Sequence, residues 1–367
     1  MIKNKKWFRQ SLSFLLSIGI VTGMVCTVPL QAKSSDTEEL TARKNSMLSK
    51  SAGFLSAAQN SNGSFGKNTV LLNDSAEAVF SAGLAGADID ISAARKWLSD
   101  NGVRYNNDTL ARTAAALGDD GLLDELLVSQ NANGGFGIRK NYDSDVLDSV
   151  LALSAVNSCA VTEKADEGSN IVYYLTDEAL ESGGWSYSGG SATDISLTAM
   201  AEYEIAYFMN ANHYSNSIVE KILGNADSYL SENVVCSFTN EEIEHNLYAQ
   251  LAHLEYNGKI DYKTIMDGLE SVQSDDGGFY NSVHLTSLAV RLLNDMTFDN
   301  TVHIYDLQSA VSPQNGYFGK DMEVNVNYTA AYTATMDTDC TVKLTVRNGK
   351  SVIYQKEDTL TLSENST

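Results

Sequence analysis

The chain of 367 residues contains only two prolines, Pro29 and Pro313. Proline breaks a helix interior because it lacks a backbone N–H and its ring clashes with the preceding turn. No proline lies between residues 30 and 312, so no helix in that region is interrupted by one. The sequence therefore allows a long series of helices over most of the chain.

Cysteine is equally sparse, with four residues in the whole chain. Cys26 lies in an apolar N-terminal run, and Cys159, Cys236 and Cys340 are far apart. Three separated cysteines form neither a disulfide framework nor a zinc knuckle, so we interpret them as buried apolar thiols. Calcium-binding loops, phosphate-binding loops and Gly-x-Ser-x-Gly motifs are absent as well. The sequence predicts no metal site and no cofactor.

The N-terminus has the pattern of an export signal. Four cationic residues (Lys3, Lys5, Lys6 and Arg9) precede an apolar run over residues 11–30, which ends in an acceptable cleavage site at Ala32. We predict a signal peptide over residues 1–32 and a secreted or cell-surface protein. The alternative is an uncleaved anchor, because the run is long enough to span a bilayer. No other apolar run approaches that length, so no membrane span is expected after cleavage.

Positive charge is scarce in the remaining chain. Loss of the four cationic residues of the signal leaves 21 Lys and Arg against 47 Asp and Glu, a net charge of −26. So acidic a surface repels nucleic acid and anionic lipid. We therefore expect no nucleic-acid partner and a soluble extracellular protein.

A glycine turn with one aromatic residue recurs along the chain. Three good copies read QNSNGSFG at residues 59–66, QNANGGFG at 130–137 and QSDDGGFY at 273–280. A fourth, ESGGWSYSGG at 181–190, keeps Gly-Gly-Trp but lacks the Gln, and two weaker copies fill the gaps. The aromatic residues are then Phe65, Tyr105, Phe136, Trp185, Phe238 and Phe279. Their spacing of about thirty to fifty residues is typical of two-helix repeats.

Each turn is flanked by two kinds of helical segment. The segments before the turns are amphipathic: 40–59, 91–101, 122–130, 169–181, 217–231 and 262–273. The segments after them are small and apolar nearly all round: 75–85, 109–117, 146–156, 195–209, 246–254 and 285–293. A helix that is apolar on every side is buried on every side, whereas a helix with one apolar stripe lies outside it. We therefore predict six inner helices surrounded by six outer ones.

Each residue type in the turn has an expected structural role. We expect glycine to end the outer helix in a left-handed conformation, the aromatic ring to fill the space between helices, and the Gln amide to bond free backbone groups. A polar residue then caps the inner helix, as Asp145 does for the segment at 146–156. The turn residues are Gln59, Phe65, Gln130, Gly134, Gly135, Phe136, Gly183, Gly184, Gln273, Gly277, Gly278 and Phe279.

Gln-x-x-x-Gly-x-aromatic turns between paired helices resemble the prenyltransferase and squalene-oxidase repeat. Terpenoid cyclases and protein prenyltransferases share this repeat and its α/α toroid. The resemblance implies an all-α (α/α)6 toroid of six helix pairs, which we place at residues 33–312. Because one fold hosts many activities, the resemblance by itself leaves the function open.

The residue pattern changes from helix-like to strand-like at Pro313. Residues 323–336, 340–354 and 358–362 alternate as strands do, and Asn348-Gly349 is a strong hairpin signal. We predict a β-strand domain or fragment over residues 313–367, which resembles the start of an immunoglobulin-like sandwich. About fifty residues is half of what such a sandwich needs, so either the strands dock on the toroid or the piece is incomplete. It offers a surface for other surface proteins.

Class II terpene cyclases carry Asp-x-Asp-Asp at the start of an inner helix, where the middle Asp protonates an alkene. Here Asp143-Ser144-Asp145-Val146 occupies the matching kind of position, and Val146 replaces the last carboxylate. The resemblance makes Asp145 the general acid and Asp143 its neighbour. The alternative, which we favour, is that Asp145 is a helix cap and Asp143 is solvated.

A toroid has a cavity inside its inner ring, and we expect residues near the starts of the inner helices to line its mouth. The expected lining residues are Tyr142, Trp185, Tyr187, Asp194 and His284. Protein prenyltransferases hold zinc with Asp, Cys and His, but no toroid cysteine here follows an Asp to join His284. We expect the cavity to bind one of three kinds of ligand: a small apolar molecule, a cobalamin-like molecule or a glycan. A cobalamin-like ligand is included because this chain resembles the cobalamin carriers, which also join an α/α toroid to a β domain.

Three functions follow from these patterns. We favour a secreted or cell-surface, non-catalytic module that binds a ligand or partner through the toroid cavity. The alternative is a divergent cyclase-like enzyme, an isomerase or lyase, with Asp145 as general acid in a degenerate Asp-x-Asp-Asp motif. The third is a polysaccharide-binding or polysaccharide-active helical barrel. Whether the protein is an enzyme stays open on the sequence alone.

Overall fold

The computed structural model describes residues 22–27, 35–67, 71–102, 106–187, 192–258, 260–298, 302–312, 325–334, 338–348 and 351–362. The chain divides into two compact units, one over Leu40–Thr297 and one that joins Met1–Glu39 to Phe298–Thr367. The helical unit ends at Thr297, before the boundary at residue 312 that the sequence predicts. The reason is that residues 302–312 already form a strand, on the N-terminal side of Pro313.

Twelve helices in the described residues alternate between outer and inner positions. The outer helices are α1 (Ser35–Ala58), α3 (Ile91–Asn101), α5 (Asp120–Leu127), α7 (Ala165–Asp177), α9 (Ser217–Asn233) and α11 (Tyr262–Val272). The inner helices are α2 (Leu71–Ala85), α4 (Asn107–Leu117), α6 (Val146–Cys159), α8 (Ile195–Asn212), α10 (Ile243–Tyr256) and α12 (Val283–Asp295). Each inner helix contacts the next, and α12 contacts α2, so the inner ring is closed.

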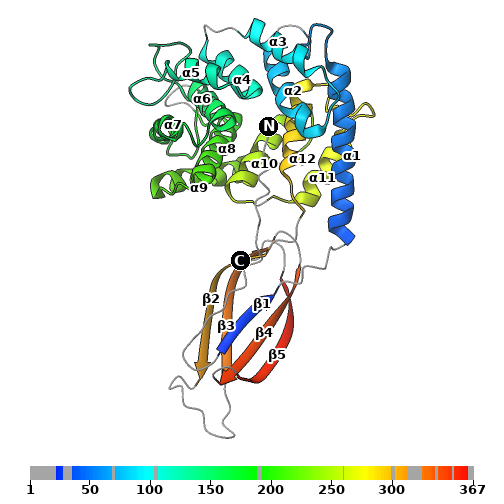
Figure 1. The fold of residues 1–367 in the computed structure, drawn as a ribbon, viewed down its shortest axis with the longest axis vertical. Coiled ribbons are helices and arrows are strands. Elements are labelled where there is room, and N and C mark those ends of the chain that lie inside the picture. Colours follow the sequence, from blue (N-terminus) through cyan, green and yellow to red (C-terminus); the bar gives the residue numbers. More distant parts are fainter. Residues whose placement is uncertain are drawn as a thin grey trace. The chain divides into compact units, whose positions relative to one another are not determined.

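Side chains also join the first and last helix pairs of the toroid, in addition to the contact between α12 and α2. The Arg43 guanidinium of α1 lies 2.6 Å from Asp267 Oδ1 and 2.7 Å from Glu270 Oε2 on α11. Lys44 Nζ donates to the carbonyls of Asn294 and Met296 at 3.0 and 2.6 Å. Helices from opposite ends of the unit therefore lie side by side (Figure 1). The predicted α/α toroid is confirmed.

The burial of each helix follows its pattern of apolar residues. On the outer helix α11, Tyr262, Ile265, Met266 and Leu269 are buried, which is a single stripe at the spacing of successive turns. On the inner helix α6, ten residues from Val146 to Asn157 are buried, and they cover every face. The inner helices are therefore packed on both sides, as the sequence predicts.

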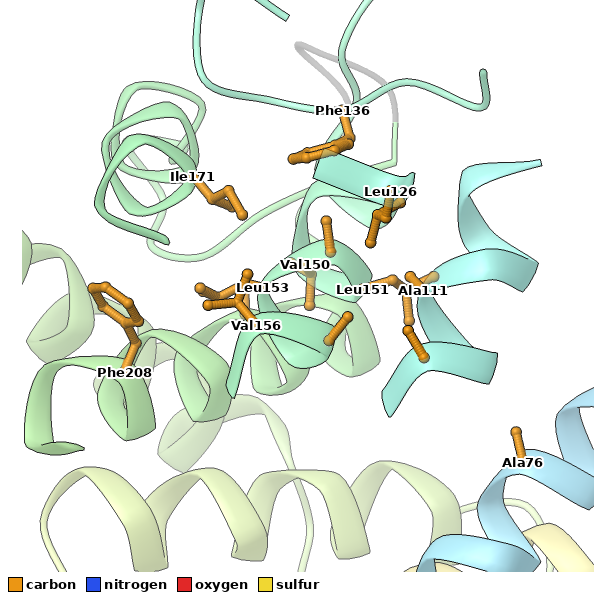
Figure 2. Packing of buried hydrophobic residues seen from close by; sticks show 14 of the residues in the cluster. Ala76, Ala111, Leu126, Phe136, Val150, Leu151, Leu153, Val156, Ile171 and Phe208 are labelled. Atoms are coloured by element: carbon orange, nitrogen blue, oxygen red, sulfur yellow. The ribbon is translucent and has the colours of Figure 1, made fainter. Parts of the chain in front are cut away.

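The aromatic residues of the three good turn copies and of the Gly-Gly-Trp copy are enclosed between helices, whereas Tyr105 lies outside the described residues. Phe65, Phe136, Trp185 and Phe279 are all 0% exposed. In Figure 2, Phe136 lies between Leu126 of α5 and Ile171 of α7, and all three belong to one buried cluster. This confirms the predicted role of the ring.

Each of these turns is also anchored by a hydroxyl group that sequence reasoning missed. The backbone N–H of the aromatic residue donates to a side chain of the following inner helix: Phe65 to Ser75, Phe136 to Ser149, Trp185 to Thr198 and Phe279 to Thr286, at 2.8 to 3.0 Å. A Ser or Thr inside each apolar segment is the signal that could have revealed it. The hydroxyl satisfies a buried N–H that would otherwise lack a partner.

The turn glycines have a different role from the predicted helix cap. Helices α5 and α11 end earlier, with Val128 and Gln273 as their C-cap residues. Gly134 and Gly277 do have positive φ angles, 87° and 88°. However, a Cβ on Gly134 would overlap the carbonyl of Asn170 on α7. Glycine is therefore required because the backbone of the next outer helix lies against the turn.

The same close approach occurs at the other turn glycines. A Cβ on Gly277 would overlap the backbone of Lys50 on α1, and one on Gly183 would lie 2.7 Å from the carbonyl oxygen of Asn225 on α9. The second glycines of the turns face side chains: Gly135 faces Tyr174, Gly184 faces Thr198 and Gly278 faces Phe54. The turns therefore set the spacing between successive repeats.

The Gln side chains bond backbone groups, as predicted. Gln59 Nε2 donates to the carbonyl of Asp90 at 2.9 Å, and the Asp90 N–H donates to Gln59 Oε1 at 2.8 Å. Gln130 Nε2 donates to the carbonyls of Gly134 and Glu167 at 2.9 and 3.1 Å. Gln273 Nε2 donates to the carbonyl of Met47 at 3.0 Å. Each Gln thus ties its turn to the next outer helix.

The described residues of the second unit form five strands in two sheets. Strand β4 (Thr338–Asn348) pairs antiparallel with β1 (Thr22–Thr27) and with β5 (Ser351–Leu362). Strand β2 (Val302–Ser312) pairs antiparallel with β3 (Asn325–Ala334). Asn348 lies opposite Ser351, so the chain reverses where the sequence predicts a hairpin. The immunoglobulin-like class of this piece stays a prediction.

The predicted signal peptide falls largely on residues 1–21 and 28–34, which lie outside the described residues. Strand β1 belongs to the same segment, so removal of residues 1–32 would leave one edge of β4 unpaired. Signal cleavage stays a prediction. Across the part of the chain that the structure describes, no helix combines the length and the apolar character needed to cross a bilayer.

Candidate functional site

A cavity of about 270 Å³ lies inside the inner ring, and all six inner helices contribute to its lining. We refer to it as the central cavity. Its apolar walls include Val150, Leu151, Met200 and Leu251, and α4 adds Ala111, Ala115 and Ala116. Its polar and aromatic walls include Glu77, Phe80, Arg112, Asn157, Tyr203, Glu204, Tyr207, Tyr248 and Arg291.

Arg291 of α12 is the main positive charge of the central cavity. Its guanidinium carbon lies 5.2 Å from the ring centroid of Phe80 and 5.4 Å from that of Tyr203, within the range of cation–π attraction. Nη1 lies 3.6 Å from Glu77 Oε2. Within the described part of the chain no hydrogen bond from the Arg291 side chain is found. A guanidinium has five N–H donors, so this group can receive an anion.

The charge of Arg291 is maintained despite its burial. Burial alone would lower its pKa, but the charges of Glu77 and the groups around it outweigh burial and hold the pKa above its ordinary value. Arg112 behaves in the same way, because Asp108 lies 2.6 Å away on the preceding turn of α4. The central cavity therefore keeps two guanidinium groups at any pH at which the protein is folded.

The carboxyl group of Glu204 is held differently. Asn157 Nδ2 donates to Glu204 Oε2 at 2.7 Å and to its carbonyl at 2.9 Å. Burial raises the pKa of Glu204 more strongly than these bonds lower it. Burial also raises the pKa of the Tyr203 and Tyr248 phenols, which keeps them protonated. The lining therefore combines retained positive charge with a carboxyl group that takes up a proton readily.

The start of α6 carries a second polar group. Asp145 is its N-cap, with φ −131°, and its Oδ1 accepts from the Asp148 N–H at 2.9 Å. Asp148 is 3% exposed. Burial, then the hydrogen bond to Asp145 and its charge, raise the pKa of Asp148 to about 8. Asp148 therefore holds its proton more tightly than an ordinary carboxyl group. It lies three residues before Leu151 on α6 and is not among the described residues that line the central cavity.

The predicted site residues lie elsewhere. Asp143 is exposed, and Tyr142 and Tyr187 are 57% and 53% exposed. Trp185 is fully buried, and its indole N–H donates to the carbonyl of Leu175 at 2.7 Å. Of these four and Asp145, none lines the described central cavity.

Asp194 and His284, the other two, have structural partners. Asp194 caps α8 and accepts from the Leu197 N–H at 2.8 Å. His284 Nε2 lies 3.1 Å from Glu244 Oε1. Burial lowers the pKa of His284, but this hydrogen bond and the nearby carboxylate charges together outweigh burial and raise the pKa. Neither belongs to the described cavity lining, which comes from the middle turns of the inner helices and not from their starts. The starts are occupied by helix caps.

The raised pKa of Asp148 predicts a pH dependence of stability. Its contribution is fully present below the ordinary carboxyl pKa and is lost as the pH rises to about 8, because the unfolded chain ionises in this range while the folded chain keeps its proton. We expect Asp148→Asn to stabilise the protein relative to wild type at pH 9 by on the order of 2 kcal/mol, with no gain at pH 4. Urea unfolding at both pH values measures this. The exposed Asp143→Asn is the control, and equal changes in both variants would contradict the assignment.

Comparisons with known proteins bear on the fold. No family model matches the sequence, and no curated protein matches it. An apo variant of the type II terpene cyclase MstE from Scytonema matches with a TM-score of 0.52 at 12% identity, over 70% of this chain and 98% of that one. Another MstE variant, in complex with geranylgeranyl dihydroxybenzoate, matches with a TM-score of 0.52 at 11% identity over the same shares.

The helical unit is therefore a terpenoid-cyclase-like α/α toroid, as the repeat resemblance implies. At this identity the likeness concerns the fold alone.

Proposed function

We propose that the toroid binds, in its central cavity, a small organic molecule with an apolar body and an acidic group. The observation that carries the proposal is the largely buried Arg291 guanidinium, whose side chain is 15% exposed. It faces the cavity and finds among the described residues an ion pair at 3.6 Å but no hydrogen bond. Arginine binds carboxylates through paired N–H donors, and a buried site strengthens such bonds. The acidic group of the ligand would complete them.

The walls supply the remainder of the ligand's environment. Leu151, Met200 and Leu251 offer apolar contact, and Phe80 and Tyr203 offer aromatic faces. The volume of about 270 Å³ is close to the small end of the range typical of ligand pockets. MstE in its complex holds geranylgeranyl dihydroxybenzoate, a prenylated molecule with an acidic group. We infer a prenylated aromatic acid, or a molecule of that chemistry, as the ligand class here.

Calorimetric titration with a prenylated benzoic acid tests this proposal. We expect binding to wild type that weakens at least about tenfold in Arg291→Met, which corresponds to about 1.4 kcal/mol for a lost charged contact. A matched probe that lacks the carboxyl group should bind both proteins equally. Equal binding of the acid by both proteins would contradict the assigned role of Arg291.

A second variant separates ligand binding from charge. Ala115 lines the central cavity, so Ala115→Phe should fill it and remove binding of either probe. Ala57→Phe on the exposed face of α1 is the control and should bind normally. If Ala115→Phe is folded and binds as wild type does, the central cavity is not the site.

Acid chemistry is the second candidate function, and the raised pKa of the Asp148 carboxyl group favours it, although Asp148 lies outside the described lining of the central cavity, three residues before Leu151. A carboxylic acid that keeps its proton can give that proton to an alkene, whose π electrons form the new C–H bond and leave a carbocation. The aromatic faces of the cavity would stabilise that cation, and loss of a proton would end the reaction. The cyclase-like alternative from the sequence gave this role to Asp145, whereas the favoured interpretation made Asp145 a helix cap. We now assign Asp145 to the positioning of Asp148.

Turnover assays on prenylated acids distinguish the two functions. A cyclase-like enzyme predicts a product that is absent with Asp148→Asn and reduced with Asp145→Asn, while both variants still bind substrate. Binding by wild type without any turnover would leave ligand binding as the function.

The export signal supports a secreted or cell-surface place for this binding. Mass spectrometry of the N-terminus of the exported protein tests it, and we expect a chain that begins after Ala32. A chain that begins at Met1 in the membrane fraction would favour the uncleaved anchor.

A glycan is the competing ligand class for the central cavity. Binding of an oligosaccharide, together with no binding of any apolar probe, would favour a glycan.

A further inference from the structure

A buried carboxylate lies in the helical unit outside the described lining of the central cavity. Glu202 of α8 is 0% exposed, and neither of its carboxylate oxygens has a hydrogen-bond partner within the described part of the chain. Burial, together with the charge of Asp227, raises the pKa of Glu202 to about 9. A buried carboxyl group without partners is costly, so it calls for either a proton or a cation.

Two further ligand groups face Glu202 from neighbouring helices. Asp227 of α9 and His253 of α10 lie with His253 Nδ1 2.6 Å from Asp227 Oδ1. Asn257 Nδ2 donates to the same Asp227 oxygen at 2.9 Å, which holds the carboxylate in place. One ligand atom from each of Glu202, Asp227 and His253 can be chosen such that all three lie within 4.8 Å of one another.

We propose that Glu202, Asp227 and His253 bind a divalent transition metal ion, with zinc as the best fit. Zinc takes imidazole nitrogen and carboxylate oxygen in a tetrahedral set, in which water can supply the fourth ligand. Calcium and magnesium need six or more oxygen ligands, and an imidazole is not among those they prefer. Two carboxylates also balance the charge of the ion.

The surroundings meet the other requirements of a metal site. The side chains of Asp227 and His253 are 21% and 11% exposed, so an ion can enter from the surface. The three ligands come from α8, α9 and α10, and these helices contact one another. A bound ion would therefore link an outer helix to two inner ones, and it would stabilise the folded state by mass action.

The prediction of no metal site rests on sequence spacing, which cannot reveal this cluster. The three residues are twenty-five and twenty-six positions apart along the chain, and no short motif links them. The zinc arrangement considered from the sequence involves His284, which lies on a different helix beside Glu244. The two His–carboxylate pairs therefore provide a matched comparison within one protein.

Titration of the full, metal-stripped chain with Co²⁺ and Zn²⁺ tests the proposal. We expect one ion per chain and a visible absorption band from Co²⁺ in a tetrahedral site. His253→Gln and Glu202→Gln should weaken binding at least about tenfold, because each removes a ligand. His284→Gln, which removes the other pair, should bind as wild type does. Zinc should raise the unfolding temperature of wild type and of His284→Gln only.

Circular dichroism shows whether each variant is folded, and Asp227→Asn, at a partly exposed position, replaces any variant that is not. Folded wild type that binds no ion above background would overturn the proposal. Binding by His253→Gln that equals wild type would overturn it as well. In either case Glu202 would lie without a metal beside the hydrogen-bonded pair of His253 and Asp227.

Discussion

Replacement of Phe136 by alanine will lower the free energy of unfolding by about 3–5 kcal/mol, because it leaves a cavity at a fully buried position. Phe136 is the aromatic residue of a repeat turn and lies between α5 and α7 at the start of α6 (Figure 2). Its loss therefore weakens three helices at once. Urea unfolding followed by circular dichroism measures the change.

Tyr142→Ala, six residues further along the same loop region, is the matched control for this loss. Tyr142 is 57% exposed, so we expect a change within about 0.5 kcal/mol. A similar cost for both substitutions would contradict the claim that the turn aromatic holds the repeat together. A small cost for Phe136→Ala with a large one for Tyr142→Ala would also reverse the assignment of core and surface.

Gly134→Ala will destabilise the protein by about 3 kcal/mol, from a left-handed backbone of roughly 1–2 kcal/mol and an overlap with the neighbouring helix of similar size. The φ angle of Gly134 is 87°, and a Cβ there would overlap the Asn170 carbonyl. Because that carbonyl belongs to the backbone of α7, the clash is relieved only if α7 moves away. Thermal and urea unfolding both measure this effect.

Gly118→Ala separates the two causes. Gly118 also has a left-handed conformation, with φ 58°, but a Cβ there would have open space around it. It should therefore cost only the backbone strain, about 1–2 kcal/mol. If Gly134→Ala and Gly118→Ala lower the free energy of unfolding equally, the close approach of the next outer helix to Gly134 contributes nothing to the loss.

The toroid could be predicted because its evidence lies in a repeated local pattern. Segments such as 146–156 are apolar on every side, and segments such as 262–273 have one stripe, so the sequence alone separates inner from outer helices. The role of the turn glycines could not be predicted in full. The contact of Gly134 with Asn170 joins successive repeats, and local turn chemistry does not contain it.

The lining of the central cavity could be predicted less well, although a usable signal exists. Arg291 interrupts the apolar run of α12, and Glu204 interrupts that of α8. A charge in a helix that is otherwise buried must face a cavity or a partner. The sequence reasoning looked instead at the helix starts, where Asp145 and Asp194 serve as caps.

The state of Asp148 could not be predicted from its neighbours in sequence. The resemblance to the Asp-x-Asp-Asp motif directed attention to Asp143 and Asp145, of which one is exposed and the other is a cap. The pKa of Asp148 is raised only because the packing of α6 buries this carboxyl group beside Asp145. Likewise, Glu202, Asp227 and His253 meet only once α8, α9 and α10 are packed.

Native mass spectrometry of the purified protein, without added ligand, tests the central claim that the central cavity is a ligand-binding site. We expect wild type to carry a small molecule in one-to-one ratio, and the bound mass to be absent from the cavity-filling variant Ala115→Phe. Ala57→Phe should retain it. Bound mass that persists in folded Ala115→Phe, or a wild-type protein that stays empty in the presence of every prenylated acid and glycan offered, would contradict the account.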